Sequence, residues 1–144
     1  MMLPSYALMA RGTRVHVALW PGREPKEVPA APEAMWPRQH LMSRAFASAG
    51  ACYVLCVGGV RGEEDIPEIA RKWIPTFTGD SAIIDPRGEI IEGPMHGEEG
   101  ILVAELDLGL VRAAKTIVEN AGHYSRPDIF ELQVRGRRFL KMTE

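Results

Sequence analysis

The amino-acid sequence predicts an α/β domain, and three observations support this. Helical and strand-like patterns alternate through the first 60 residues, which is the order of a layered α/β domain. Residues 52–57 are apolar on both faces, as in a strand buried between two layers. A glycine-punctuated stretch, residues 79–108, has the pattern of three strands joined by two turns. The 144 residues, 46% of them hydrophobic, are enough for one domain or part of one.

The first 60 residues contain two predicted helix–strand pairs. Tyr6–Arg11 has the pattern of the end of a helix, which Gly12 stops. Val15–Trp20 has the pattern of a short buried strand. A second helix is expected over Arg38–Ala49, ended by Gly50, with an apolar face formed by Leu41, Ala45 and Ala49. The strand Cys52–Val57 follows. Between the pairs, residues 21–37 carry five prolines, which favours a surface loop.

The stretch from residue 79 onward predicts a three-stranded meander. Its parts are a strand at Ser81–Asp85, a Pro86–Gly88 hairpin turn, a strand at Glu89–Glu92 that breaks at Gly93-Pro94, a charged turn at Gly97–Gly100 and a half-buried strand at Ile101–Leu108.

Three further elements are expected around the meander. Residues 58–78 form a loop with a short helix around Ile66–Trp73, Leu108–Glu119 forms an amphipathic helix closed near Asn120 and Gly122, and Pro127–Val134 is extended.

Composition excludes several classes of function. The formal net charge is −2, and the basic residues are scattered, so nucleic-acid binding is not expected. The single basic run, Arg135–Lys141, is terminal and predicts a solvated tail, so we divide the chain into residues 1–134 and a basic tail, residues 135–144. No apolar run approaches the roughly 20 residues that span a bilayer, and no signal peptide is apparent. Two cysteines without a disulfide framework favour the cytoplasm.

The residues usually associated with catalysis have simpler explanations here. Cys52 and Cys56 lie on one face of an apolar strand, which predicts buried, inert thiols. No two of the four histidines have metal-ligand spacing, so a metal site is not expected. Asp80 and Ser81 could suggest a hydroxyl nucleophile, but no G-x-S-x-G elbow surrounds them. His16 is expected to be a satisfied polar group near a layer edge.

Several ordered motifs resemble one family. GDSAIIDPRGEII (residues 79–91) followed by EEGILVAELDL (residues 98–108) resembles the C-terminal half of the nitrilase branch of the carbon–nitrogen hydrolases. The tail GHYSRPDIFEL (residues 122–132) and the start YALMARG with VHVALWPG (residues 6–22) are similar to the same family. The opening departs from the family's usual Met-Pro-Leu-x-Arg, because Ser5 stands where arginine is common.

The resemblance implies an α-β-β-α sandwich, of which this chain is the C-terminal half and therefore incomplete. It also implies a Cys nucleophile, a Glu base and a Lys that stabilises the intermediate. In the family these residues precede the segment matched by Met2–Leu8, so none can be placed on a residue of this sequence. No catalytic residue is therefore expected in this chain, and the chain alone is expected to be inactive.

Two sets of residues receive roles from the resemblance. Trp20 and Pro21 would border the substrate pocket, with packing against the loop as an equal alternative. His123, Tyr124, Arg126 and Asp128 would serve subunit assembly, with a free flexible terminus as the competing interpretation.

The function implied is hydrolysis of a nitrile or amide to a carboxylic acid and ammonia, without a cofactor. The alternative is a non-catalytic protein that joins other subunits or complements an N-terminal half. Because half a sandwich exposes an apolar face, we expect the isolated chain to be poorly soluble, partly molten or oligomeric. Codons upstream of Met1 that encode Cys-Trp-Glu in frame would indicate that the start is misplaced, rather than that the chain is an assembly protein. Substrate identity and oligomer size do not follow from the sequence.

Overall fold

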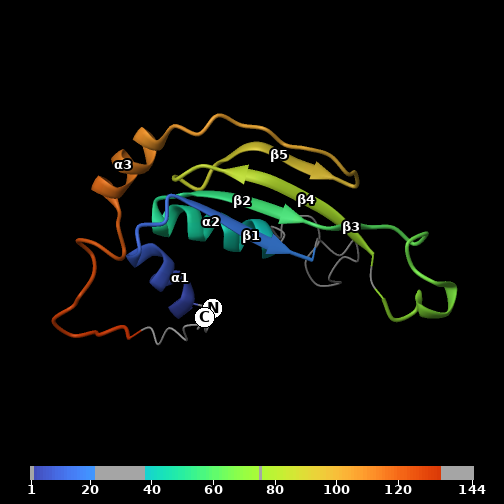
Figure 1. The fold of residues 1–144 in the computed structure, drawn as a ribbon, viewed down its shortest axis with the longest axis horizontal. Coiled ribbons are helices and arrows are strands. Elements are labelled where there is room, and N and C mark those ends of the chain that lie inside the picture. Colours follow the sequence, from blue (N-terminus) through green and yellow to red (C-terminus); the bar gives the residue numbers. More distant parts are fainter. Residues whose placement is uncertain (1, 22–37, 75, 134–144) are drawn as a thin grey trace, which may run out of the picture.

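The structure is a computed structural model that describes residues 2–21, 38–74 and 76–133. Its elements, in chain order, are α1 (Met2–Ala10), β1 (Val15–Trp20), α2 (Arg38–Gly50), β2 (Tyr53–Gly58), β3 (Val60–Arg61), the 3₁₀ helix η1 (Glu68–Ala70), β4 (Phe77–Ile84), β5 (Ile90–His96) and α3 (Leu108–Ile117). Figure 1 shows a twisted sheet with α2 along one face.

The sheet combines one parallel pair with antiparallel pairs. Its strand order is β1-β2-β4-β3, and β5 pairs with β4. β1 and β2 are parallel and in register from Val15 opposite Tyr53 to Trp20 opposite Gly58. A parallel pair needs a crossover connection, and α2 lies in that connection. β4 then runs antiparallel to β2 and to β5. The predicted α/β class is confirmed.

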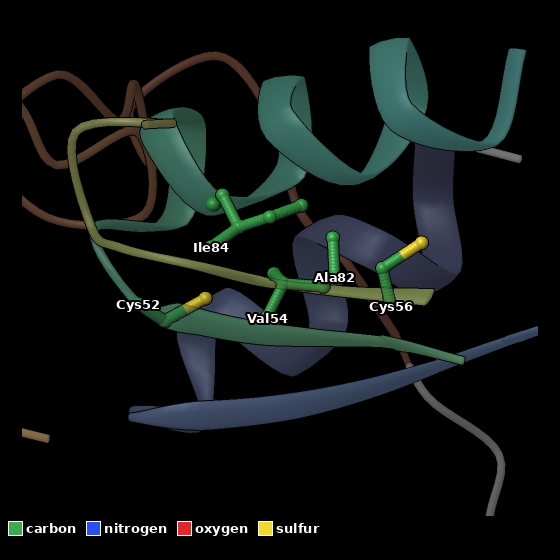
Figure 2. Packing of buried hydrophobic residues seen from close by; sticks show 6 residues of the cluster. Cys52, Val54, Cys56, Ala82 and Ile84 are labelled. Atoms are coloured by element: carbon green, nitrogen blue, oxygen red, sulfur yellow. The ribbon is translucent and has the colours of Figure 1, made fainter. Parts of the chain in front are cut away.

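The hydrophobic core lies between the sheet and α2. It is formed by Ala47, Cys52, Val54, Cys56, Ala82 and Ile84, with Ala18, Trp20, Phe46 and Ile90 packed around it. Figure 2 shows the strand side chains on the side of the sheet that α2 covers. Both cysteines therefore occupy the core, as their spacing predicts.

The prediction for the buried face of α2 was wrong. Leu41 is 54% exposed and Ala45 is also exposed, whereas the buried residues of this helix are Gln39, His40, Ser43, Ala47 and Gly50. Small residues let the helix axis approach the sheet closely. The two polar side chains are tolerated because β4 offers them backbone hydrogen bonds. The positions of the apolar residues alone predict that the opposite side of α2 is buried.

β1 has the predicted bounds but is not a buried strand. It lies at the edge of the sheet, and Val15, Val17 and Leu19 are 40%, 52% and 77% exposed. The alternate residues of the strand are only partly exposed. An edge strand covered by helices on one face alone has this alternation. β2 is more deeply buried, although its last apolar residue, Val57, is exposed.

The meander prediction was partly wrong. β5 continues through Gly93-Pro94 to His96, because irregularities in its register with β4 accommodate the break. Residues 101–107 form no strand, although their burial alternates and Ile101 and Val103 are exposed. Any extended chain that lies on a surface shows alternating burial of its side chains, whereas a strand must also form backbone hydrogen bonds with a neighbouring strand. The helix then begins at Leu108, where the Asp107 side chain accepts a hydrogen bond from the Gly109 amide at 2.7 Å.

Other boundaries also differ from the predictions. The helix expected around Ile66–Trp73 is only η1, which Pro67 precedes, followed by turns. α3 ends at Ile117, because Val118 is extended. The tail begins with a turn, in which the amides of Ile129 and Phe130 donate to the Arg126 carbonyl, where an extended chain was expected. Residues 22–37 of the proline-rich loop, Val134 and the basic tail lie outside the described residues.

The predicted hairpin turn between β4 and β5 is organised by one carboxylate. Asp85 is buried, and its side chain accepts hydrogen bonds from the amides of Arg87 and Glu89 and from Arg87 Nε. Gly88 supplies the positive φ, 87°, that closes the turn. Burial alone would raise the pKa of Asp85, but the hydrogen bonds from Arg87 and Glu89 outweigh it and hold that pKa below its ordinary value.

Replacing Ile84 by alanine should destabilise the fold far more than replacing Leu41. Ile84 is fully buried in the core, so its truncation should lower the free energy of unfolding by about 2–5 kcal/mol. Leu41→Ala, on the exposed side of α2, should change it by less than about 0.5 kcal/mol. Urea unfolding followed by circular dichroism measures both, and equal losses would contradict the assigned face of α2.

Asp85→Asn should destabilise the chain in a pH-dependent way. At neutral pH the loss should be about 1–3 kcal/mol, because an amide cannot accept all three hydrogen bonds. Since the folded-state pKa lies below the unfolded value of 3.8, the carboxylate's contribution is fully present above that value. It is lost as the pH falls through the folded pKa. Urea midpoints of both proteins between pH 7 and pH 3 should therefore converge; a constant difference would refute this role.

Candidate functional site

The candidate site lies at the edge where the two parallel strands end. Trp20 and Gly58, the last residues of β1 and β2, are register partners at this edge. α2 is the next helix or strand after β1 along the chain. β4 starts and β5 finishes at the same edge, since Gly79 pairs with His96. In α/β sheets, ligands bind outside the carboxyl ends of parallel strands. The topology therefore singles out this edge before any side chain is considered.

The backbones of β2 and β4 come unusually close here. A Cβ on Gly58 would lie 1.9 Å from the carbonyl oxygen of Gly79, so only glycine fits at position 58. The Gly58 amide donates to Ser81 Oγ at 3.0 Å. Ser81 is thus engaged with the neighbouring strand, which agrees with the structural explanation preferred for it over a nucleophile.

Two buried side chains from the first turn of α2 hold the start of β4. Gln39 Nε2 donates to the carbonyl oxygens of Gly79 at 2.8 Å and Asp80 at 3.1 Å. His40 Nε2 lies 2.6 Å from the Asp80 carbonyl oxygen. Because a carbonyl only accepts, this contact places a proton on Nε2 of His40. These contacts fix the Gly79–Asp80 backbone against the helix, and we call the four residues the α2–β4 clamp.

Asp80 is the most constrained residue of the site. It is buried and has a φ of 60°, a conformation in which non-glycine residues are uncommon. Its carboxylate accepts hydrogen bonds from Thr78 Oγ1 and from His96 Nδ1, both at 2.8 Å. The clamp and these two hydrogen bonds together hold the strained backbone of Asp80 in place.

His96 and Asp80 form an acid–imidazole pair that opens toward solvent. The carboxylate is buried, but the imidazole side chain is 60% exposed. Since the carboxylate oxygen accepts at Nδ1, the neutral ring has Nε2 as its acceptor. A histidine oriented in this way by a carboxylate has the geometry of a general base. Both cysteines of the chain are in the core, so neither offers an exposed nucleophile to this pair.

The side chain of Trp20 faces α2, and the loop against which the alternative would pack it lies outside the described residues. Trp20 Nε1 donates to Ser43 Oγ at 3.1 Å, and its ring packs against the core. Pro21, the next residue, is exposed. The loop that would complete a pocket with these two residues falls outside the described part of the chain, so their role at a pocket border stays a prediction.

The four tail residues contact one another in pairs. The rings of His123 and Tyr124 lie 4.6 Å apart between centroids. Arg126 Nε and Nη2 donate to the two carboxylate oxygens of Asp128 at 2.9 and 2.7 Å, and both side chains are exposed. Hydrogen bonding to Arg126 lowers the pKa of the Asp128 carboxyl. This exposed, locally ordered segment is accessible to another subunit, and its role in assembly stays a prediction.

His16 and the clamp show where sequence reasoning succeeded and failed. His16 stacks on Phe46 with a centroid distance of 4.3 Å, and burial lowers its pKa, in line with a structural histidine. Gln39 and His40 were not identified from the sequence, nor was the pairing of Asp80 with His96. The register of the β4–β5 hairpin is the one signal that could have brought Asp80 and His96 together.

Within the described ranges, no group of three or more His, Cys, Asp or Glu side chains could hold a metal ion. A search of the same residues finds no helix with the length and apolar character of a membrane span.

The family model for carbon–nitrogen hydrolases matches residues 2–116. "Nitrilase 2" of an unknown prokaryotic organism is 41% identical over 136 residues, which cover 93% of this chain and 40% of that protein. An aliphatic nitrilase of Rhodococcus rhodochrous is 35% identical and covers 94% of this chain and 38% of its own length. Among solved structures, the carbon–nitrogen hydrolase of Helicobacter pylori G27 superposes with a TM-score of 0.60 at 23% identity, over 80% of this chain and 39% of that one. The chain thus spans about 40% of the length of the relatives it matches.

The two thiols should be unreactive in the folded chain. Burial raises the pKa of Cys52 to about 11 and also raises that of Cys56. Because only the thiolate reacts, a rise of about two pKa units over the ordinary value lowers the reactive fraction of Cys52 roughly 100-fold near neutral pH. Titration with Ellman's reagent should show slow labelling of both thiols in the native chain and rapid labelling in urea. Rapid native labelling of either thiol would contradict its burial.

Proposed function

The chain belongs to the carbon–nitrogen hydrolase family, and from this premise we propose that it is the C-terminal portion of a nitrilase-type enzyme. Such an enzyme converts a nitrile or amide to a carboxylic acid and ammonia. The observation that carries the proposal is the 41% identity to Nitrilase 2 across 93% of the chain. The remaining part of the enzyme, in one polypeptide or as a separate one, supplies the Cys, Glu and Lys of the resemblance.

The proposed reaction consumes two waters for each nitrile. The Cys thiolate attacks the nitrile carbon, and protonation of the nitrogen gives a thioimidate. The first water adds to this carbon, and ammonia leaves to give a thioester. The second water hydrolyses the thioester, which releases the acid and regenerates the thiol. The Glu accepts and returns protons, and the Lys stabilises the negative charge that develops in each addition.

This chain contributes the framework beside the reacting groups. The carboxyl edge of β1 and β2 forms one wall, and the α2–β4 clamp holds the start of β4 rigid against it. Trp20 and Pro21 stand where β1 leaves the sheet, which suits a border of the substrate pocket. A rigid framework is what a catalytic site requires of its surroundings. The cytoplasmic location predicted from the unpaired cysteines belongs to the same proposal.

A non-catalytic assembly protein is the second candidate. The exposed tail around Tyr124 and Phe130 and the exposed apolar residues of β1 favour it, because such surfaces commonly bind other chains. Under this proposal the chain joins hydrolase subunits, including further copies of itself, through the tail residues His123, Tyr124, Arg126 and Asp128.

The purified 144-residue chain should release no ammonia from nitriles or amides. Aliphatic and aromatic substrates of both classes should be tested with an ammonia assay at millimolar concentration. Cys52→Ala and Cys56→Ala are the matched controls, since these are the only thiols in the sequence. Ammonia release that either substitution abolishes would refute the assignment of the nucleophile to another segment.

Activity should appear when the missing segment is supplied. The part of Nitrilase 2 that this chain does not cover is produced together with the chain, and ammonia release from a nitrile is measured. A partner in which its nucleophilic Cys is changed to Ala is the control and should be inactive. A stable complex that turns over neither nitriles nor amides would favour the assembly protein.

A further inference from the structure

The Asp80–His96 pair combines a buried carboxylate with an exposed imidazole. The side chain of Asp80 is 4% exposed and that of His96 is 60% exposed, and Nδ1 of the ring lies 2.8 Å from Oδ1 of the carboxylate. Because a carboxylate only accepts, the proton between them belongs to Nδ1 of the neutral ring. Nε2 makes no hydrogen bond to the residues that the structure describes. The pair therefore presents a basic nitrogen to solvent.

The carboxylate of this pair is fixed from two sides. Thr78 Oγ1 donates to Oδ2 of Asp80 at 2.8 Å, which leaves Oδ1 for the imidazole. The α2–β4 clamp holds the backbone of Asp80 at a φ of 60°, which non-glycine residues seldom adopt. Strained backbone of this kind clusters at functional sites. The orientation of the imidazole is therefore set before any ligand arrives.

A hollow of about 500 Å³ adjoins the pair. Thr78, whose hydroxyl donates to Asp80, lines the hollow, and so does Gly97, which follows His96. The Gly97 amide donates to the Thr78 carbonyl at 2.8 Å, so these two lining residues are held together. The volume is in the range of sites that bind small molecules. The pair thus stands at the border of a space that can receive a substrate.

The charges around the hollow favour a cationic substrate. The lining includes four carboxylate side chains, those of Glu64, Asp65, Glu98 and Glu99. Its one guanidinium, that of Arg61, lies 4.4 Å from the centroid of the Phe77 ring, so the lining itself already accommodates a cation over an aromatic face. Because the carboxylates outnumber the guanidinium, the hollow attracts positive charge and repels negative charge.

We propose that the Asp80–His96 pair is a second hydrolytic site, which acts on small thioesters and activated carboxylic esters that carry an ammonium group. Nε2 of His96 takes a proton from a water as the water oxygen adds to the carbonyl carbon. The bond from this carbon to the leaving sulfur or oxygen then breaks, and the imidazolium gives its proton to the leaving group. The products are a carboxylic acid and a thiol or alcohol. His96 is the catalytic base, and Asp80 is its positioning residue.

This inference goes beyond the proposed function, because the reaction uses residues of this chain alone and a different class of substrate. A thiolate leaves without help from a strong acid, whereas an amide nitrogen must be protonated before it can leave. Amides and nitriles should therefore stay intact at this site. Hydrolysis of a thioester is compatible with the expected lack of ammonia release by the isolated chain.

The test measures thiol release from acetylthiocholine by the full 144-residue chain, with Ellman's reagent. A blank without substrate subtracts any labelling of Cys52 and Cys56. N-acetylhistidine at the same concentration is the reference for an imidazole that nothing orients, and the chain should exceed its rate at least about 10-fold. The neutral isostere 3,3-dimethylbutyl thioacetate replaces the quaternary nitrogen by carbon. Acetylthiocholine should react at least about 5-fold faster than this isostere, because the carboxylates attract its charge.

Substitutions separate the base, its positioning residue and the charged lining. His96→Gln should lower the rate at least about 10-fold, and added imidazole should restore part of the rate of His96→Ala. Asp80→Asn should cause a similar loss, and asparagine tolerates the positive φ of this position. Nitrogen NMR of the His96 ring should show the proton on Nδ1 in the parent chain and lose this preference in Asp80→Asn.

Glu98→Gln combined with Glu99→Gln should reduce the preference for acetylthiocholine over its isostere. Glu92→Gln, on β5 but outside the lining, is the matched control and should keep this preference. Circular dichroism and thermal unfolding of each variant show whether the fold is intact.

A parent rate no higher than that of N-acetylhistidine, or a rate that His96→Gln leaves unchanged, would overturn the inference. Equal rates with acetylthiocholine and its isostere would overturn the assigned class of substrate. The inference and the proposed function fail separately. Thioester hydrolysis by a chain that no nitrilase segment can make release ammonia refutes only the hydrolase of nitriles and amides. Ammonia release by the complemented chain, with no His96-dependent thioester hydrolysis, refutes only the second site.

Discussion

Packing of a single helix against one face of the sheet is the constraint on which the structure depends. α2 lies close to the strands because Ser43, Ala47 and Gly50 are small, and the core of Val54, Cys56 and Ile84 fills the space beneath it. Close packing of this kind excludes water from the ladder between β2 and β4 and fixes the register that aligns Gly58 with the start of β4. The opposite face receives no comparable layer from the described residues. The same arrangement therefore produces both a well-defined core and an apolar surface.

The α2–β4 clamp transmits this constraint to the candidate site. Gln39 and His40 are polar residues on the buried side of a helix, where an unpaired donor would be costly. Each is satisfied by a backbone carbonyl at the start of β4, and Asp80 is held there in a left-handed conformation. Its carboxylate then faces His96 across the hairpin. Helix position, strand conformation and the acid–imidazole pair are consequently parts of one arrangement, and a shift of α2 would alter all three.

The sequence predicted elements better than surfaces. Val15–Trp20 was located to the residue and α2 to within one, because glycine and proline punctuate the periodic segments. The buried side of α2 could not be predicted, since polar residues there are stabilised by partners forty residues away. Residues 101–107 alternate as a strand does, yet a ladder depends on a neighbour that local sequence does not specify. The pairing of Asp80 with His96 likewise requires the hairpin register.

The two edges of the sheet differ in a way that bears on how the chain meets other molecules. β5 carries Pro94, which cannot donate to a ladder, together with Glu92 and several register irregularities, all of which discourage further pairing. β1 has the sequence Val-His-Val-Ala-Leu-Trp, without proline, lysine or a bulge, and its exposed side chains are large and apolar. Natural sheets commonly protect edges that remain in solvent, so by these features β5 is a protected edge and β1 an unprotected one. Since the carboxyl end of β1 is also part of the candidate site, the unprotected edge and the candidate site lie in the same region of the sheet.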